Sequence, residues 1–126
     1  MSTLTITLAH VHDVLDDDGP AAGERRVLVD RLWPRGIKKE RLVHDEWDKD
    51  VAPSDELRKA FHGGHIPFEE FSTRYRHELA EGDAPQQLLD RAKEAGARTI
   101  VLLFATKDVD HNQAPVLKDV LEELLA

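Results

Sequence analysis

Two uninterrupted apolar segments constrain the fold of this chain most strongly. Residues 25–33 (RRVLVDRLW) and 98–106 (RTIVLLFAT) each hold consecutive apolar side chains instead of alternating apolar with polar ones. This pattern is typical of strands that are covered on both faces, as in parallel sheets. Helical patterns lie between and after the two segments. The sequence therefore predicts a small α/β domain with a largely parallel sheet and helices on both faces.

Periodic patterns of apolar residues in the rest of the sequence predict the other strand and the helices. Residues 3–12 alternate, with Leu4, Ile6 and Leu8 opposite Thr3, Thr5 and Thr7, which predicts a half-solvated strand near a sheet edge. Helices are expected after the N-cap Ser54, from Pro67 to Gly82, over residues 84–95, and from about Gln113. Residues 37–53 fit no single element, and the pattern specifies neither the strand order nor the oligomeric state.

Length and composition exclude several classes of protein. A chain of 126 residues without repeats or linkers predicts one domain over residues 1–126. The absence of cysteine excludes thiol nucleophiles, iron–sulfur clusters and disulfide scaffolds. No apolar run is long enough to span a membrane and the N-terminus lacks a signal peptide, so we expect a cytoplasmic protein. The nucleotide-binding, zinc-protease and hydrolase motifs are absent too, so no cofactor is predicted.

Charged residues follow both apolar segments. Asp30 and Arg31 come after the first, and Lys107 and Asp108 come after the second. In open α/β sheets, ligands bind beyond the carboxyl ends of the strands. If the two strands are parallel neighbours, these four side chains converge at one edge of the sheet. An antiparallel pairing would separate them.

The loop after the first segment has features of a binding loop. Trp33 offers a stacking surface, Gly36 permits unusual backbone angles, and Arg31 and Arg35 are suited to bidentate bonds with a carboxylate or phosphate. The alternative is a turn that ends the strand, with its arginines paired to nearby acids. Composition alone slightly favours that alternative.

The loop after the second segment offers acid–base groups. His111 is a candidate general acid or base, Asp108 is placed to orient it, and Lys107 is a candidate anion ligand. Asn112 is expected to cap the last helix. The alternative is a polar loop with a capping asparagine and no ligand. His10 and His12 form a His-x-His pair, but no third ligand follows from the spacing, so no metal site is predicted.

The segment VDRLWPRG resembles a known family, the small bacterial YeaO-like proteins of domain-of-unknown-function family 488. The matching elements are Val29 to Gly36, Val51 to Ser54, Glu56 to Arg58, Phe71, Arg74-Tyr75, Glu78-Leu79, Lys107-Asp108, His111-Asn112, Ala114 and Leu117. The resemblance implies a compact cytoplasmic α/β protein and brings no activity or cofactor. Broader relatives have a cysteine motif after the last strand, where this chain has none.

These observations favour a site for a small anionic ligand, of unspecified identity. Arg31, Arg35 and Lys107 would hold the anion, and Asp30, Asp108 and His111 would transfer protons if the protein is an enzyme. A non-catalytic binding module is the alternative. A nucleic-acid-binding regulator is less favoured because the net charge is −8. Residues 25–41 nevertheless carry seven basic and two acidic residues, a local +5 that suits a small anion.

Overall fold

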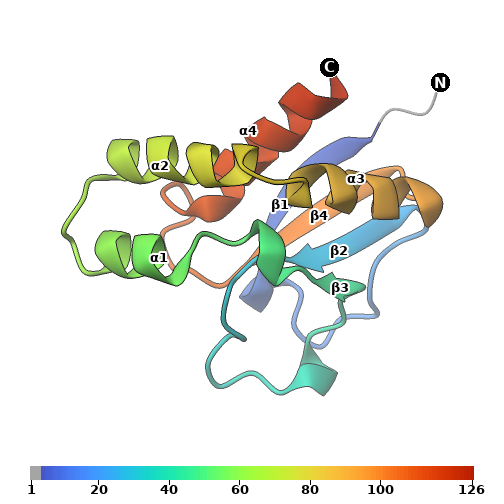
Figure 1. The fold of residues 1–126 in the computed structure, drawn as a ribbon. Coiled ribbons are helices and arrows are strands. Elements are labelled where there is room, and N and C mark those ends of the chain that lie inside the picture. Colours follow the sequence, from blue (N-terminus) through green and yellow to red (C-terminus); the bar gives the residue numbers. More distant parts are fainter. Residues whose placement is uncertain (1–3) are drawn as a thin grey trace.

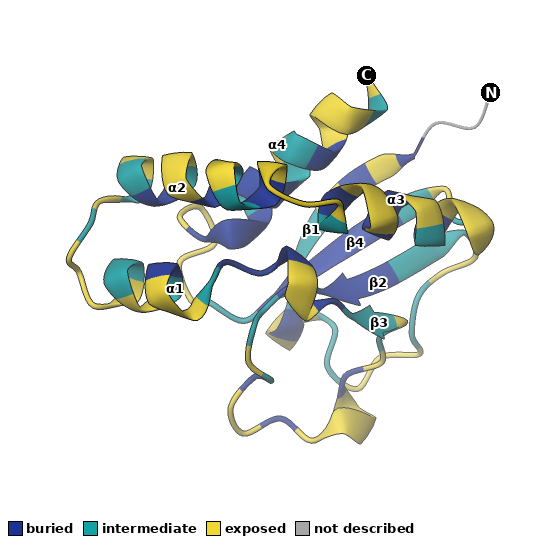
Figure 2. Ribbon diagram, in the orientation of Figure 1, coloured by how far each residue is buried: buried dark blue, intermediate teal, exposed yellow. Residues whose placement is uncertain are grey.

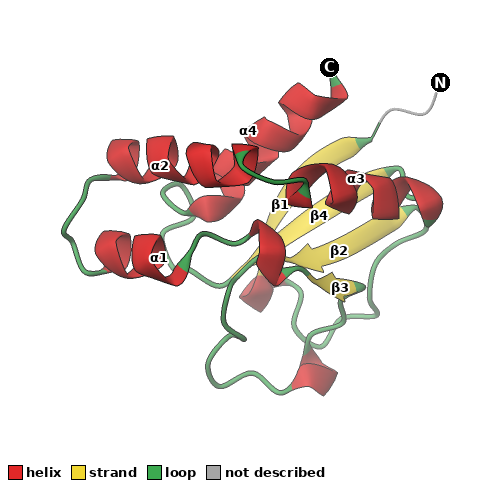
Figure 3. Cartoon of the chain, viewed as in Figure 1, coloured by secondary structure: helices red, strands yellow, loops and turns green. Residues whose placement is uncertain are grey.

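A four-stranded parallel sheet forms the centre of the protein. The computed structural model describes residues 4–126, and its strands run in the order β1-β4-β2-β3 (Figures 1 and 3). The strands are β1 (Thr5–His10), β2 (Glu24–Leu28), β3 (Glu46–Trp47) and β4 (Thr99–Phe104). Both β1 and β2 pair with β4 in parallel, with Leu8 and Val27 each opposite Leu102. The predicted α/β class with a parallel sheet is confirmed.

The central strand β4 explains why its segment is continuously apolar. Ile100, Leu102 and Phe104 point to one face of the sheet, and Val101 and Leu103 point to the other. All five side chains are buried because both faces are covered, in contrast to the edge strand β1, where Thr5 and Thr7 are exposed (Figure 2). The prediction of an edge strand is confirmed; Thr3, its first predicted residue, lies outside the described residues.

All four α-helices pack on one side of the sheet or beyond its carboxyl end (Figure 1). They are α1 (Asp55–His62), α2 (Phe68–Ala80), α3 (Ala84–Glu94) and α4 (Gln113–Leu125). Two predicted caps hold helix ends: the Ser54 hydroxyl accepts from the Leu57 N–H at 3.2 Å, and the Asn112 side chain accepts from the Ala114 N–H at 2.8 Å. In residues 4–126 no helix is long and apolar enough to cross a membrane.

The opposite face of the sheet is covered by loops and single-turn 3₁₀ helices. η1 (Val11–Asp13) and the segment around η2 (Lys39–Arg41) close over it, and η3 (Lys49–Val51) precedes α1. Val11, Leu28, Leu42 and Leu103 form a second buried cluster there, against which Trp33 and Trp47 pack. Helical turns therefore lie on both faces of the sheet. Each of the α-helices, however, contributes buried side chains to the core cluster on the other face, which includes Leu57, Phe71 and Leu117.

Strand β2 is shorter than its apolar pattern, and strand β3 is not predicted by any pattern. Strand β2 ends at Leu28, although the Val29 N–H still donates to the Leu103 carbonyl at 3.1 Å. The chain then leaves the sheet at Asp30, whose side chain bonds across to the backbone after β4. Strand β3, only two residues long, arises in the segment that the sequence left unassigned.

Candidate functional site

The carboxyl ends of β1, β4 and β2 lie side by side at one edge of the sheet. The parallel pairing of β2 with β4 meets the condition on which the convergence of the strand-end residues depends. Asp30 follows β2, Ala105 and Thr106 follow β4, and His10 ends β1. These residues lie at the base of the candidate site.

Asp30 joins three elements at this edge. The Ala105 N–H donates to its Oδ2 at 3.0 Å, and the side-chain amide of Gln113, at the start of α4, donates to its Oδ1. Burial raises the pKa of Asp30 from 3.8 to about 6, against the lowering effect of the Ala105 and Gln113 hydrogen bonds and of the nearby His10. The carboxylate is therefore ionised at neutral pH at a cost in free energy.

His10 has a defined structural role beside this aspartate. Its Nε2 lies 3.1 Å from the Ala105 carbonyl oxygen, and its Nδ1 accepts from the His12 N–H at 3.1 Å. A carbonyl only accepts and a backbone N–H only donates, so in these contacts Nε2 is the donor and Nδ1 is the acceptor. Both ring nitrogens are engaged, and the ring stacks on His12. Within residues 4–126, no group of three metal-ligating side chains occurs.

A pocket of about 300 Å³ opens beside Asp30. Residues from three parts of the chain line it: Asp30, Arg31, Leu32, Trp33, Pro34 and Arg35 after β2; Pro53, Arg58 and His62 before and on α1; and Ala105, Thr106 and Gln113 between β4 and α4. Asp30 is the one acidic residue among them, beside three arginines. The lining is therefore cationic with a single, partly buried carboxylate.

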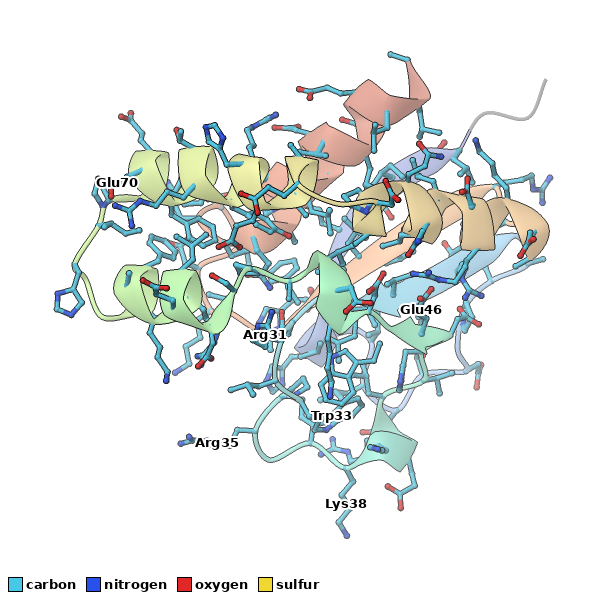
Figure 4. All side chains as sticks on the ribbon, in the orientation of Figure 1. Arg31, Trp33, Arg35, Lys38, Glu46 and Glu70 are labelled. Atoms are coloured by element: carbon cyan, nitrogen blue, oxygen red, sulfur yellow. The ribbon has the colours of Figure 1, made fainter. Side chains whose placement is uncertain are left out.

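The arginines reach the pocket from different directions. Arg31 lies between α1 and the strand ends, and its Nε donates to the Pro53 carbonyl at 2.8 Å; Arg35 extends outward from its loop (Figure 4). On α1, Arg58 donates from Nη2 to Asp55 at 2.6 Å. Its Nε is buried without a hydrogen-bond partner in the described part of the chain. The Nε atoms of Arg25 and Arg91, outside the pocket lining, are in the same condition, so this feature is not specific to the pocket.

His62 lies one helical turn after Arg58, on the same wall of the pocket. Partial burial of the imidazole, together with the charge of Arg58, lowers the pKa of His62. His62 is therefore neutral at pH 7 and offers a hydrogen bond rather than a charge.

The loop after β2 is held in shape by its tryptophan. The Trp33 indole N–H donates to the Ile37 carbonyl at 2.6 Å, and its ring meets Trp47 edge-on with centroids 5.5 Å apart. Gly36, with φ of +79°, occupies the left-handed conformation that the tight return requires. Trp33 lines the pocket and also packs against the second core cluster, so its position is fixed before any ligand binds.

The predicted residues of the second loop lie apart from this pocket lining. Lys107, Asp108 and His111 are exposed, and His111 Nδ1 lies 3.1 Å from the Asp108 carboxylate. Asn112 is buried: it caps α4 and also donates to the Asp108 carbonyl at 2.8 Å. The expected Asp108–His111 contact exists, but it faces Phe68 of α2 rather than Asp30.

Part of the basic segment is neutralised by neighbouring acids. Three of its seven cations form ion pairs, and these pairs are Arg25–Glu46 at 3.1 Å, Arg26–Asp17 at 2.7 Å and Arg41–Asp16 at 2.8 Å. The alternative interpretation concerned Arg31 and Arg35, and neither forms an ion pair within residues 4–126. Arg31 and Arg35, by contrast, line the pocket.

Comparison with known proteins identifies the family. Residues 5–126 match the family described as "Inactive DUF488-N3 subclade". The chain belongs to this family. It is 48% identical to the uncharacterized protein YeaO of Escherichia coli over 100 residues, which cover 79% of this chain and 84% of that protein. It is 39% identical over 117 residues to the uncharacterized proteins Rv3073c of Mycobacterium tuberculosis and Mb3100c of Mycobacterium bovis, covering 92% of each chain. No solved structure matches it significantly.

Membership in the DUF488-N3 family confirms the resemblance indicated by VDRLWPRG. Six consecutive residues of that segment, Asp30 to Arg35, line the pocket. The second loop contributes Ala105 and Thr106, together with Gln113 just beyond it. The first motif therefore builds about half of the site.

The sequence predicts no role in the site for several lining residues, which are Pro53, His62, Ala105, Thr106 and Gln113, or for the neighbouring His10. Gln113 was assigned only to the start of a helix, although a polar side chain directly after an N-cap is placed to reach a strand end. His62 was considered only as part of a turn, and His10 only as a metal ligand. Their positions depend on how α1 and β1 pack, which no local pattern specifies. Arg58, for which the sequence predicts no role in the site, also lines the pocket.

Proposed function

We propose that this protein binds a small organic anion in the pocket at the carboxyl edge of its sheet. The observation that carries the proposal is a pocket whose lining includes Arg31, Arg35 and Arg58 and a single acid, Asp30. Guanidinium groups recognise carboxylates and phosphates through paired hydrogen bonds.

The size and charge of the site favour a small ligand over a nucleic acid. A volume near 300 Å³ is at the lower end of the range for small-molecule sites. Three cations of the basic segment are already paired with acids, and the chain carries a net charge of −8, which repels a polyanion. A gel-shift assay at low salt tests this exclusion.

Binding without turnover is the version of this function that we favour. The description of the matched family contains the word "inactive", and the chain has no cysteine for the thiol chemistry expected of broader relatives. The lack of cysteine also agrees with the cytoplasmic location that we propose. A binding role requires only the arginines, the shaped loop and the partly buried carboxylate.

Acid–base catalysis is the second candidate, and one observation favours it. Burial raises the pKa of Asp30 to about 6, close to neutral, where a carboxyl group exchanges protons most usefully. Asp108 and His111, on the neighbouring loop, are further proton-transfer candidates. Mass spectrometry of each anion after incubation with the protein separates the candidates, because a consumed compound means catalysis.

The binding proposal is tested by calorimetry with matched variants. A panel of small carboxylates and organic phosphates is screened for thermal stabilisation, which reaches about 2.7 kcal/mol at a hundredfold excess over Kd. For each anion that binds, Arg35→Gln and Arg58→Gln are expected to weaken binding by roughly tenfold. Lys38→Gln is the control, because Lys38 is exposed in the same loop and is not part of the lining.

The proposal is contradicted if no member of the panel stabilises the protein at millimolar concentration. It is also contradicted if Lys38→Gln weakens binding as much as Arg35→Gln does, since the effect would then reflect general surface charge.

A further inference from the structure

The position of Asp30 restricts what kind of anion the pocket accepts. Asp30 is a lining residue, and its carboxylate is bonded to two other lining residues, Ala105 and Gln113, so it lies close to the space that an anion would occupy. Two like charges at short range repel strongly, and more so away from water. A ligand that carries negative charge and no hydrogen-bond donor would therefore be repelled by this carboxylate.

The hydrogen bonds of Asp30 are only half complete. An ionised carboxylate has about four acceptor positions, and the Ala105 N–H and the Gln113 amide occupy one on each oxygen. About two positions remain. They belong to a group that is largely removed from water, where missing hydrogen bonds are costly.

No cation of the described chain neutralises Asp30 directly. Among the ion pairs within residues 4–126, none includes Asp30; Arg31 gives its Nε to Pro53, and Arg58 pairs with Asp55. Burial accordingly raises the pKa of Asp30. A partly buried carboxylate in this condition is stabilised by any donor brought to it, which includes a donor on a ligand.

We propose that the ligand is a small organic anion that also carries a hydroxyl or amine hydrogen-bond donor, with the arginines binding its anionic group and Asp30 accepting from its donor. This inference rests on the proposed function and names the ligand class for the same site. Hydroxy acids and hydroxyalkyl phosphates are the simplest members of that class. Asp30 then acts as the specificity residue, because it accepts a donor and repels a simple anion.

Two pairs of compounds test this inference by calorimetry at pH 8, where Asp30 is ionised. Lactate is compared with propionate, and glycerol 3-phosphate with propyl phosphate; each pair shares its anionic group and differs in hydroxyl groups. The hydroxylated member is expected to bind the wild-type protein roughly tenfold to a hundredfold more tightly, as for a hydrogen bond to a charged group.

The Asp30→Asn variant supplies the second readout. Removing the charge is expected to tighten binding of propionate and propyl phosphate and to reduce the preference for the hydroxylated member to a few-fold. Lys38→Gln keeps the wild-type preference. The comparison of compounds on the wild-type protein does not depend on the variant, so it remains decisive if Asp30→Asn folds poorly.

The outcomes separate the two proposals. If no compound of either pair binds, the proposed function fails and this inference fails with it. If both members of each pair bind equally and Arg35→Gln weakens both, the anion site stands and the donor inference is overturned. A preference that Asp30→Asn leaves unchanged also overturns it, because the donor must then bind elsewhere.

Discussion

Replacing Asp30 with asparagine is expected to stabilise the protein at neutral pH and to change its stability little in acid. Burial raises the pKa of Asp30 from 3.8 to about 6 in the folded protein. The folded state therefore holds a proton that the unfolded state has released between these pH values. Stability due to this group falls as pH rises from about 4 to 6, and the full cost persists above pH 6.

The magnitude follows from the shift. About two pKa units at roughly 1.4 kcal/mol each correspond to about 3 kcal/mol for ionised Asp30 at pH 7. Asparagine avoids this cost and retains both contacts: its carbonyl accepts from the Ala105 N–H, and its NH2 donates to the Gln113 side chain once that amide is reversed. We expect the variant to be more stable than wild type at pH 7 by up to about 3 kcal/mol.

Urea denaturation of both proteins from pH 3 to pH 8 measures the difference directly. Asp16→Asn is a control of opposite sign, because the hydrogen bond from Arg41 lowers the pKa of Asp16. That control should lose stability relative to wild type at neutral pH and recover as the pH falls below 4. An Asp30→Asn difference that stays constant across this range would refute the reasoning.

Two further substitutions test the frame around the site by urea denaturation. Asn112→Ala removes the cap of α4 and is expected to cost about 1–2 kcal/mol, whereas Asn112→Ser keeps a hydroxyl that can accept at the cap and is expected to cost less; equal losses in the two variants would argue against capping. Tyr75→Phe removes the hydroxyl that donates to the buried Val51 carbonyl and is expected to cost about 1–3 kcal/mol; unchanged stability would mean that this carbonyl finds another donor.

The fold was predictable where local chemistry determines structure. The uninterrupted apolar run of β4 indicates burial on both faces, and Ser54 and Asn112 mark helix starts because their side chains accept from the first free N–H groups. The strand order was not predictable, since it depends on pairing between distant segments. Strand β3 has only two residues and leaves no periodic signal.

The part of the site formed by the loop after β2 was predictable from the sequence, but the residues that complete the pocket lining were not. Asp30, Arg31, Trp33 and Arg35 follow directly from the end of β2, and the parallel pairing with β4 brings them to the predicted edge. The separation of Asp108 and His111 from this lining arises from the path of the chain between β4 and α4. Gln113 reaches Asp30 because α4 begins beside β2, a tertiary relation that no spacing encodes.

The central claim is that a small anion binds at the carboxyl edge of the sheet. An NMR titration of ¹⁵N-labelled protein with glycerol 3-phosphate tests it most directly. The account predicts saturable shifts of the amide signals of residues 31–35, 58–62 and 105–106. Shifts confined to residues 107–112, or no shifts at millimolar concentration, would contradict it.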